Sequence, residues 1–205
     1  MNTPKTINPP AENSTPNNKT TTHINENDYK VITEYNNLNQ ITKKTHYSSH
    51  IDPPDFDNKN NYYLYFIQIF DPQTNKKIKE TTYNSDGTKT IDEYGPDGII
   101  SSTEYNPDES IHYIEEYSPE NNNLIKTTWF HDGRTYHIEE YHPQTGNKTK
   151  FTSYYPNGNI KTLEKFKPHS GKLIKSTTYY PKGSIKFILI YNPKKDDPQS
   201  RTIHY

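Results

Sequence analysis

The chain repeats itself about every 25 residues, and this repeat constrains the fold more than any other feature. TSYYPNGNIKTLEKF begins at Thr152, and TTYYPKGSIKFILIY begins at Thr177. An aromatic residue followed by a turn marks each unit, at Phe70, Tyr94, Tyr117, Tyr141, Phe166 and Tyr191. A second aromatic anchor follows within each of the first five units, at Tyr83, Tyr105, Trp129, Tyr154 and Tyr179. Such a period predicts a row of similar supersecondary units, each packed on its neighbours.

Each unit has the composition of a β-hairpin. The stretches between turns are short and rich in Ile, Thr, Tyr and Phe, which favour strands. Pro and Gly recur too often to leave room for a helix. About 25 residues fit two strands of about seven residues and two tight turns.

The two turns of a unit differ, and together they predict a register. FKPHSGKL suits a four-residue loop closed by Gly171, and YYPNGNI suits a three-residue loop closed by Gly158. A two-residue Asn-Gly turn is the alternative for the second. The three-residue loop predicts that one face carries Tyr154, Phe166, Tyr179, Phe187 and Tyr191, and that Ser176 and Thr178 lie on the other. The unit from Tyr94 to Tyr105 is two residues shorter and needs a bulge or slip that the pattern does not place.

The composition limits how these hairpins assemble. Only 28% of the chain is hydrophobic, and 19 of its residues are Tyr. These residues are too few for a second layer, so we expect an all-β protein: one long, twisted antiparallel meander sheet of about thirteen strands. A closed barrel or propeller is the alternative. We expect the repeat domain to span residues 28–205 in about six and a half units, with a polar insert at 51–61, and residues 1–27 to be disordered.

Several classes of function are disfavoured by composition. There is no Cys, which excludes disulfides and thiolate chemistry. The net charge is -1 and no run of 18 apolar residues occurs, so we expect neither nucleic-acid binding nor membrane insertion. No signal peptide is visible. We therefore expect a cytoplasmic protein, or a secreted one if a signal was removed.

The repeat consensus, roughly E-Y-x-P-x-T-G-x-x-I-K-x-T-x-Y-Y-P-D-G-x-I, resembles the Tyr/Asn/Lys-rich repeat proteins of phytoplasmas, which form a family with a domain of unknown function. The resemblance covers residues 29–205, and HPQTGNKTKFTSYYPNGNIKTLEKF is similar to a whole family unit. The YYPNGNIK element also resembles the variant MORN repeat and, more distantly, the YD repeats of large bacterial toxins. The resemblance implies a repeat sheet, no known reaction and an effector-like role towards a host cell.

The residues that could carry chemistry have structural explanations. His112, His131, His137 and His142 cluster in two units, but we predict strand and turn positions and no metal site. Glu115-Glu116 and Glu139-Glu140 are adjacent pairs that should point to opposite faces, whereas Glu115, Glu139 and Glu164 could form a row. No catalytic motif or cofactor fingerprint is present. We therefore expect neither an enzyme nor a cofactor.

The aromatic anchors remain as candidate binding residues. Cross-strand aromatic pairs stabilise sheets, and exposed Tyr and Trp residues also dominate protein interfaces. We predict a non-enzymatic, protein-binding or effector-like module. The alternatives are a carbohydrate-binding repeat module that holds a glycan and an enzyme with an unrecognised site. The candidate partner-binding face comprises Tyr117, Tyr141, Tyr154, Phe166, Tyr179, Phe187 and Tyr191.

Overall fold

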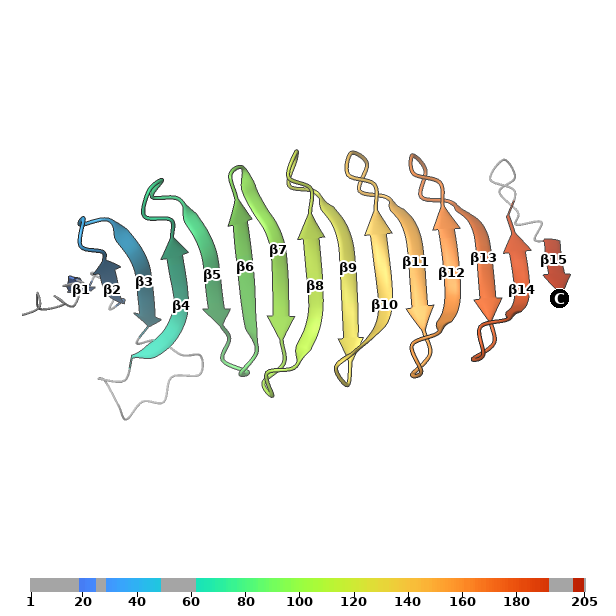
Figure 1. The fold of residues 1–205 in the computed structure, drawn as a ribbon, viewed down its shortest axis with the longest axis horizontal. Coiled ribbons are helices and arrows are strands. Elements are labelled where there is room, and N and C mark those ends of the chain that lie inside the picture. Colours follow the sequence, from blue (N-terminus) through green and yellow to red (C-terminus); the bar gives the residue numbers. More distant parts are fainter. Residues whose placement is uncertain (1–18, 25–28, 49–61, 192–200, 205) are drawn as a thin grey trace, which may run out of the picture.

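In a computed structural model, which describes residues 19–24, 29–48, 62–191 and 201–204, the chain forms one antiparallel sheet without a helix. The fifteen strands are β1 (Thr20–Ile24), β2 (Lys30–Tyr35), β3 (Ile41–Ser48), β4 (Tyr63–Phe70), β5 (Lys77–Tyr83), β6 (Lys89–Gly95), β7 (Gly98–Tyr105), β8 (Ile111–Tyr117), β9 (Leu124–His131), β10 (Arg134–Tyr141), β11 (Lys148–Tyr154), β12 (Ile160–Phe166), β13 (Leu173–Tyr179), β14 (Ile185–Ile190) and β15 (Arg201–His204). Each strand pairs only with its neighbours in sequence, and β1 and β15 form the two edges (Figure 1). The predicted meander is therefore confirmed, and the closed barrel or propeller is wrong.

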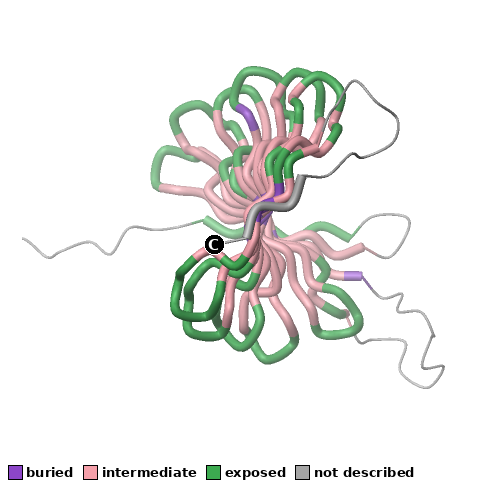
Figure 2. Tube along the Cα trace, turned by 90° about the vertical axis from the view of Figure 1, so that its right-hand side faces the viewer, coloured by how far each residue is buried: buried purple, intermediate pink, exposed green. Residues whose placement is uncertain are grey.

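The sheet is a single layer. Viewed along its long axis, the turns spread into two fans around a narrow centre, as a strongly twisted sheet requires (Figure 2). Among the described residues, Ile188 is the one buried hydrophobic residue, whereas ten Thr and Ser residues are buried. The stretches that the structure describes contain no helix long and apolar enough to cross a membrane. Stability must therefore come from contacts between neighbouring side chains on each face.

One face, here the Thr–Ile face, is built from a regular alternation of two residue types. From β2 to β14, odd-numbered strands contribute Thr and even-numbered strands contribute Ile or Leu, and each residue is the direct cross-strand partner of the next. The ladder runs Ile32, Thr45, Ile67, Thr81, Ile91, Thr103, Ile114, Thr128, Ile138, Thr152, Leu163, Thr177 and Ile188. Long aliphatic side chains on both sides cover the short Thr side chains, which is why Thr152 and Thr177 are only 4% and 3% exposed.

The opposite face, here the carboxylate face, carries a second row through the middle of the sheet. Its members are direct partners in the same way, from Gln68, Glu80, Asp92, Ser102, Glu115 and Thr127 to Glu139, Phe151, Glu164, Ser176 and Leu189. The short side chains of Ser102, Thr127 and Ser176 each lie between longer ones, and Thr127 is 3% exposed between Glu115 and Glu139. Lateral packing of large against small residues thus takes the place of a second layer.

The turns explain why the units differ in length. The loop after Tyr117 has four residues, closed by the Asn122 N–H bond to the Ser118 carbonyl, whereas Gly95 and Gly98 are direct partners across a two-residue turn. This difference accounts for the short unit that begins at Tyr94. The three-residue loop predicted at Pro156–Gly158 is confirmed: Gly158 N–H donates to the Tyr155 carbonyl and has a φ of 84°. Asp132 and Gly133 instead form a two-residue turn, in which both have positive φ.

The face prediction was wrong because most hairpins contain a bulge next to the turn. Tyr154 pairs with Ile160 and Phe166 with Leu173, as the turns predict, but Lys161 and Ile174 are then extra residues in their strands. Each bulge reverses the faces beyond it. Ser176 and Thr178 consequently share the carboxylate face with Phe187, and Ser176 is 6% exposed while Phe187 is half-buried.

The prediction for the amino-terminal segment was also wrong in part. Residues 20–24, placed within a disordered region of 1–27, form β1 and pair with β2 from Thr20–Glu34 to Ile24–Lys30. The other residues of that region, and the polar insert at 51–61, lie outside the described residues.

Side chains also join the turns of successive units. Asn157 Nδ2 and Asn159 Nδ2 lie 2.9 and 2.8 Å from the Pro181 carbonyl oxygen. At the other end of the strands, Thr145 Oγ1 and Asn147 Nδ2 lie 2.8 and 3.0 Å from the Pro168 carbonyl. The many Asn and Pro residues therefore connect one unit to the next.

Candidate interaction surface

The predicted partner-binding residues do not lie on one face. Strand alternation places Tyr117, Tyr141, Phe166, Phe187 and Tyr191 on the carboxylate face, and Tyr154 and Tyr179 on the Thr–Ile face. The first anchors thus face one way, and the second anchors other than Trp129 face the other way. Five of the seven residues remain candidates for a common surface.

Aromatic rings form a continuous row across β8 to β11 on the carboxylate face. Trp129 lies between its two direct partners, with ring centroids 4.9 Å from Tyr113 and 5.6 Å from His137. Phe151 continues the row diagonally, 5.4 Å from His137. Here this row is called the aromatic row. All four side chains are half-buried, and no other layer of the described chain covers them.

Sequence reasoning missed this row because it aligned Trp129 with the second anchors, such as Tyr154. In the structure Phe130 occupies that position on the Thr–Ile face, and Trp129 corresponds to Ser153, since both pair with His137. The signal was the Asp132-Gly133 dipeptide, which is typical of a two-residue turn.

The carboxylates beside the aromatic row accept hydrogen bonds from tyrosine hydroxyls. Tyr117 Oη donates to Glu115 over 2.6 Å, and Tyr141 donates to Glu139, which also binds Lys148. Glu104 accepts from Tyr113 Oη at 2.9 Å and lies 2.8 Å from His112 Nδ1. The side chains are therefore held in place by their neighbours.

Electrostatics keeps these tyrosines protonated. Burial, followed by the hydrogen bond to Glu139, raises the pKa of Tyr141 to about 12, and burial with the Glu104 bond raises the pKa of Tyr113 to about 12. Burial alone would raise the pKa of Glu139, but the bonds from Lys148 and Tyr141 outweigh it and lower that pKa. At neutral pH Glu139 is thus ionised, while the phenols of Tyr113 and Tyr141 are neutral.

The histidines considered as metal ligands are dispersed. His112 and His137 contact Trp129 from opposite sides, at 5.4 and 5.6 Å. His131 is the last residue of β9, while His142 follows β10 and its ring centroid lies 5.5 Å from that of His169. Among the described residues, no group of three or more potential ligands could hold a metal ion.

The adjacent glutamates are separated as predicted. Glu115 and Glu139 lie in the central row of the carboxylate face with Glu164. Glu116 and Glu140 point the other way, where they pair with Lys126 and Lys150 at 2.6 and 2.8 Å. Neither adjacent pair can therefore act on one substrate.

Two turns at one end of the central strands enclose an open hollow. The loop after β7 contributes Asp108 and Ser110, and the β9–β10 hairpin contributes Phe130 and Tyr136. Tyr136 is 42% exposed. The hollow combines aromatic rings with hydrogen-bonding side chains.

Comparisons with known proteins identify a repeat family. A family model described as "Protein of unknown function (DUF2963)" matches residues 58–104, 105–153, 131–178 and 154–203. A search of curated proteins finds no match.

Solved structures show weaker likenesses. An S. aureus TarM mutant, crystallised with Fondaparinux, alpha-GlcNAc-glycerol and UDP, is 18% identical with a TM-score of 0.38, over 47% of this chain and 19% of that chain. A porin-like protein from Bacteroides uniformis is 12% identical with a TM-score of 0.27, over 91% and 93% of the two chains. The TcdB2-TccC3-TEV structure is 11% identical with a TM-score of 0.29, over 89% of this chain and 9% of that chain.

Proposed function

The chain belongs to this family of repeat proteins of unknown function, DUF2963, and on that premise we propose that it is a non-enzymatic module that binds another protein through its carboxylate face. The aromatic row of Tyr113, Trp129, His137 and Phe151 carries the proposal, since its rings touch across four strands of a sheet that has no second layer. Tyr and Trp are the residues most enriched at the energetic centres of protein interfaces.

The surroundings of the row define the partner's chemistry. The carboxyl groups of Glu104, Glu115 and Glu139 lie beside the rings, and Lys148 binds Glu139. The face therefore favours a partner that presents an apolar centre with Lys or Arg around it, because complementary charges speed association and fix orientation. Burial of the half-exposed rings would supply the binding free energy.

A more specific version of this proposal is an effector-like role towards a host cell. It draws on the similarity of the repeat to the Tyr/Asn/Lys-rich proteins of phytoplasmas, together with the variant MORN and YD repeats. A repeat array that presents one long face to a partner suits such a role.

Two adjacent residues provide the test. Trp129 and Phe130 point to opposite faces at the end of β9, so Trp129→Ala and Phe130→Ala remove similar rings from different surfaces. We expect an immobilised chain to retain its partner protein, Trp129→Ala to lose it and Phe130→Ala to keep it, with both variants folded by circular dichroism. Equal retention by the two variants would place the binding surface elsewhere.

A carbohydrate-binding module is the second candidate, and the hollow favours it. Its Asp108, Ser110 and Tyr136 combine polar groups with an exposed ring, as sugar sites commonly do. Glycan-array binding that Tyr136→Ala removes and Trp129→Ala retains would support this alternative. Binding of a protein partner through the carboxylate face should instead be lost in Trp129→Ala and retained in Tyr136→Ala.

A further inference from the structure

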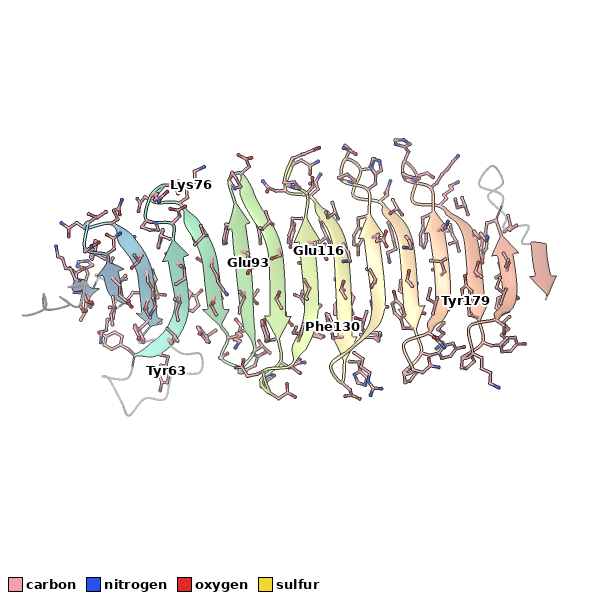
Figure 3. The ribbon with its side chains drawn as sticks, viewed as in Figure 1. Tyr63, Lys76, Glu93, Glu116, Phe130 and Tyr179 are labelled. Atoms are coloured by element: carbon pink, nitrogen blue, oxygen red, sulfur yellow. The ribbon has the colours of Figure 1, made fainter. Side chains whose placement is uncertain are left out.

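A row of paired charges runs beside the Thr–Ile ladder on the same face, two positions away from the ladder residue in each strand. Here it is called the Glu–Lys row. Its charged members on β2, β6, β8 and β10 are Glu, and those on β3, β5, β9 and β11 are Lys. Figure 3 shows Glu93 and Glu116 at the same height on β6 and β8. Three pairs are direct ion pairs: Glu34–Lys43 at 2.9 Å, Glu116–Lys126 at 2.6 Å and Glu140–Lys150 at 2.8 Å.

Lys165 breaks this alternation on β12, where the pattern requires Glu. It is the direct partner of Lys150 on one side and of Lys175 on the other. Like charges directly opposite one another destabilise a sheet. Lys165 and Lys175 are exposed, and within the described part of the chain neither forms an ion pair. The three residues are here called the lysine triplet.

Within the described part of the chain, Glu140 pairs with Lys150, but no carboxylate pairs with Lys165 or Lys175. Residues 142–191 contain nine Lys and one acidic residue, whereas residues 77–141 contain fourteen acidic and five basic residues. The one acidic residue, Glu164, belongs to the carboxylate face, where it lies 3.4 Å from Ser176 Oγ. Strands β11 to β14 therefore present positive charge without a carboxylate on the Thr–Ile face.

We propose that the lysine triplet binds an acidic, extended segment of another protein. In the preceding units the position equivalent to Lys165 carries a Glu, whose carboxylate lies beside a Lys of a neighbouring strand. Carboxylates spaced as in an extended strand should therefore pair with the lysine triplet. Apolar groups lie alongside: Ile190 is the direct partner of Lys175 and is 44% exposed, and Leu163 belongs to the neighbouring ladder. An acidic polypeptide with apolar side chains satisfies both features, whereas a phosphate backbone satisfies the charge alone. This site lies on the face opposite the aromatic row and is independent of it.

The experiment compares a charge reversal within the lysine triplet with a matched charge reversal outside it. A fluorescein-labelled oligoglutamate of about twelve residues is titrated into the full chain at about 50 mM salt, where surface charges are weakly screened. We expect Lys165→Glu to weaken binding at least about tenfold, because it replaces an attraction with a repulsion. Lys182→Glu, in the exposed β13–β14 turn, makes the same change in net charge and should weaken binding less than about threefold.

Separate measurements test the fold of the variants and the class of ligand. Lys165→Glu restores the Glu–Lys alternation, so its melting temperature should equal or exceed that of the unaltered chain. A lower melting temperature would contradict the premise that Lys165 is unfavourable between Lys150 and Lys175. Equal weakening by both variants would show non-specific charge attraction. Tighter binding of an oligothymidylate of equal charge, or of phosphatidylserine vesicles, with the same dependence on Lys165, would overturn the proposal in favour of a nucleic acid or a lipid surface.

Discussion

Single residues in left-handed conformations close the hairpins. The last position of the three-residue loops has positive φ in every described instance, whether the residue is Gly87, Gly158, Gly183, Asn39 or Glu109. The four-residue loops end in the same conformation at Gly146 and Gly171. Gly171 and Gly158 could be assigned from the sequence because only a residue tolerant of positive φ fits there. Glu109 could not, since its side chain gives no such signal.

Gly158→Val should destabilise the chain by about 1–3 kcal/mol, because a β-branched residue is strained at positive φ. No atom lies within 4 Å of the position that a Cβ would take, so the loss reflects the backbone and not a clash. Lys182→Val, at the middle of the equivalent turn, should change stability by less than about 0.5 kcal/mol. Urea unfolding measures both, and a neutral Gly158→Val would contradict the loop assignment.

The Tyr141–Glu139 hydrogen bond should make stability depend on pH. The folded-state pKa of Glu139 is lowered, so the stabilisation is complete above its ordinary pKa of 4.5 and is lost as the pH falls through the lowered value. Tyr141→Phe should therefore cost about 1 kcal/mol at pH 7 and less at a pH below the lowered pKa of Glu139. Equal losses at both pH values, measured by urea unfolding, would show that the hydroxyl does not stabilise the ionised carboxylate.

At the scale of elements, the sequence predicts strands and turns well and faces poorly. The hairpin unit, the two turn types and the row of Glu115, Glu139 and Glu164 all follow from residue type and spacing. The bulges at Lys161 and Ile174 do not, because these residues are ordinary strand formers and the irregularity arises from how a turn twists its strands. Each bulge reverses the faces beyond it, and for that reason the sequence pattern places Tyr154 and Tyr179 on the same face as Phe166, which is wrong.

Two Asn side chains that donate to one Pro carbonyl should stabilise the hairpin contact cooperatively. Asn157→Ala or Asn159→Ala alone leaves Pro181 with one donor, so each should cost less than about 0.5–1 kcal/mol. The double variant should cost more than the sum of the two, since the carbonyl then has neither donor. A double-mutant cycle by urea unfolding tests this, and strict additivity would show that water replaces the bonds without loss.

At the scale of the whole molecule, every contact between strands joins sequence neighbours. The charge is also distributed along this axis, with acidic residues concentrated before Tyr141 and lysines after it. A linear array of this kind has no closing contact between its ends, so its stability is approximately a sum over units and their interfaces. An internal unit should therefore be removable if the Thr–Ile ladder and the Glu–Lys row both continue across the junction.

Deletion of residues 142–166 meets this condition. It joins Tyr141 to Lys167, so that β10 pairs with β13, Ile138 faces Thr177 and Glu140 faces Lys175, which continues the Thr–Ile ladder and the Glu–Lys row. We expect a folded sheet that unfolds cooperatively, with a lower urea m-value because less surface is exposed on unfolding.

The matched control deletes residues 142–154, which removes β11 with its preceding loop. The turn at Pro156–Gly158 then follows β10, and the bulge at Lys161 places Leu163 opposite Glu139 and Glu164 opposite Ile138. Both rows are broken, so the shorter deletion should lose cooperative unfolding although it removes fewer residues. If the 13-residue deletion is as stable as the 25-residue one, the cross-strand rows do not specify the register of the sheet.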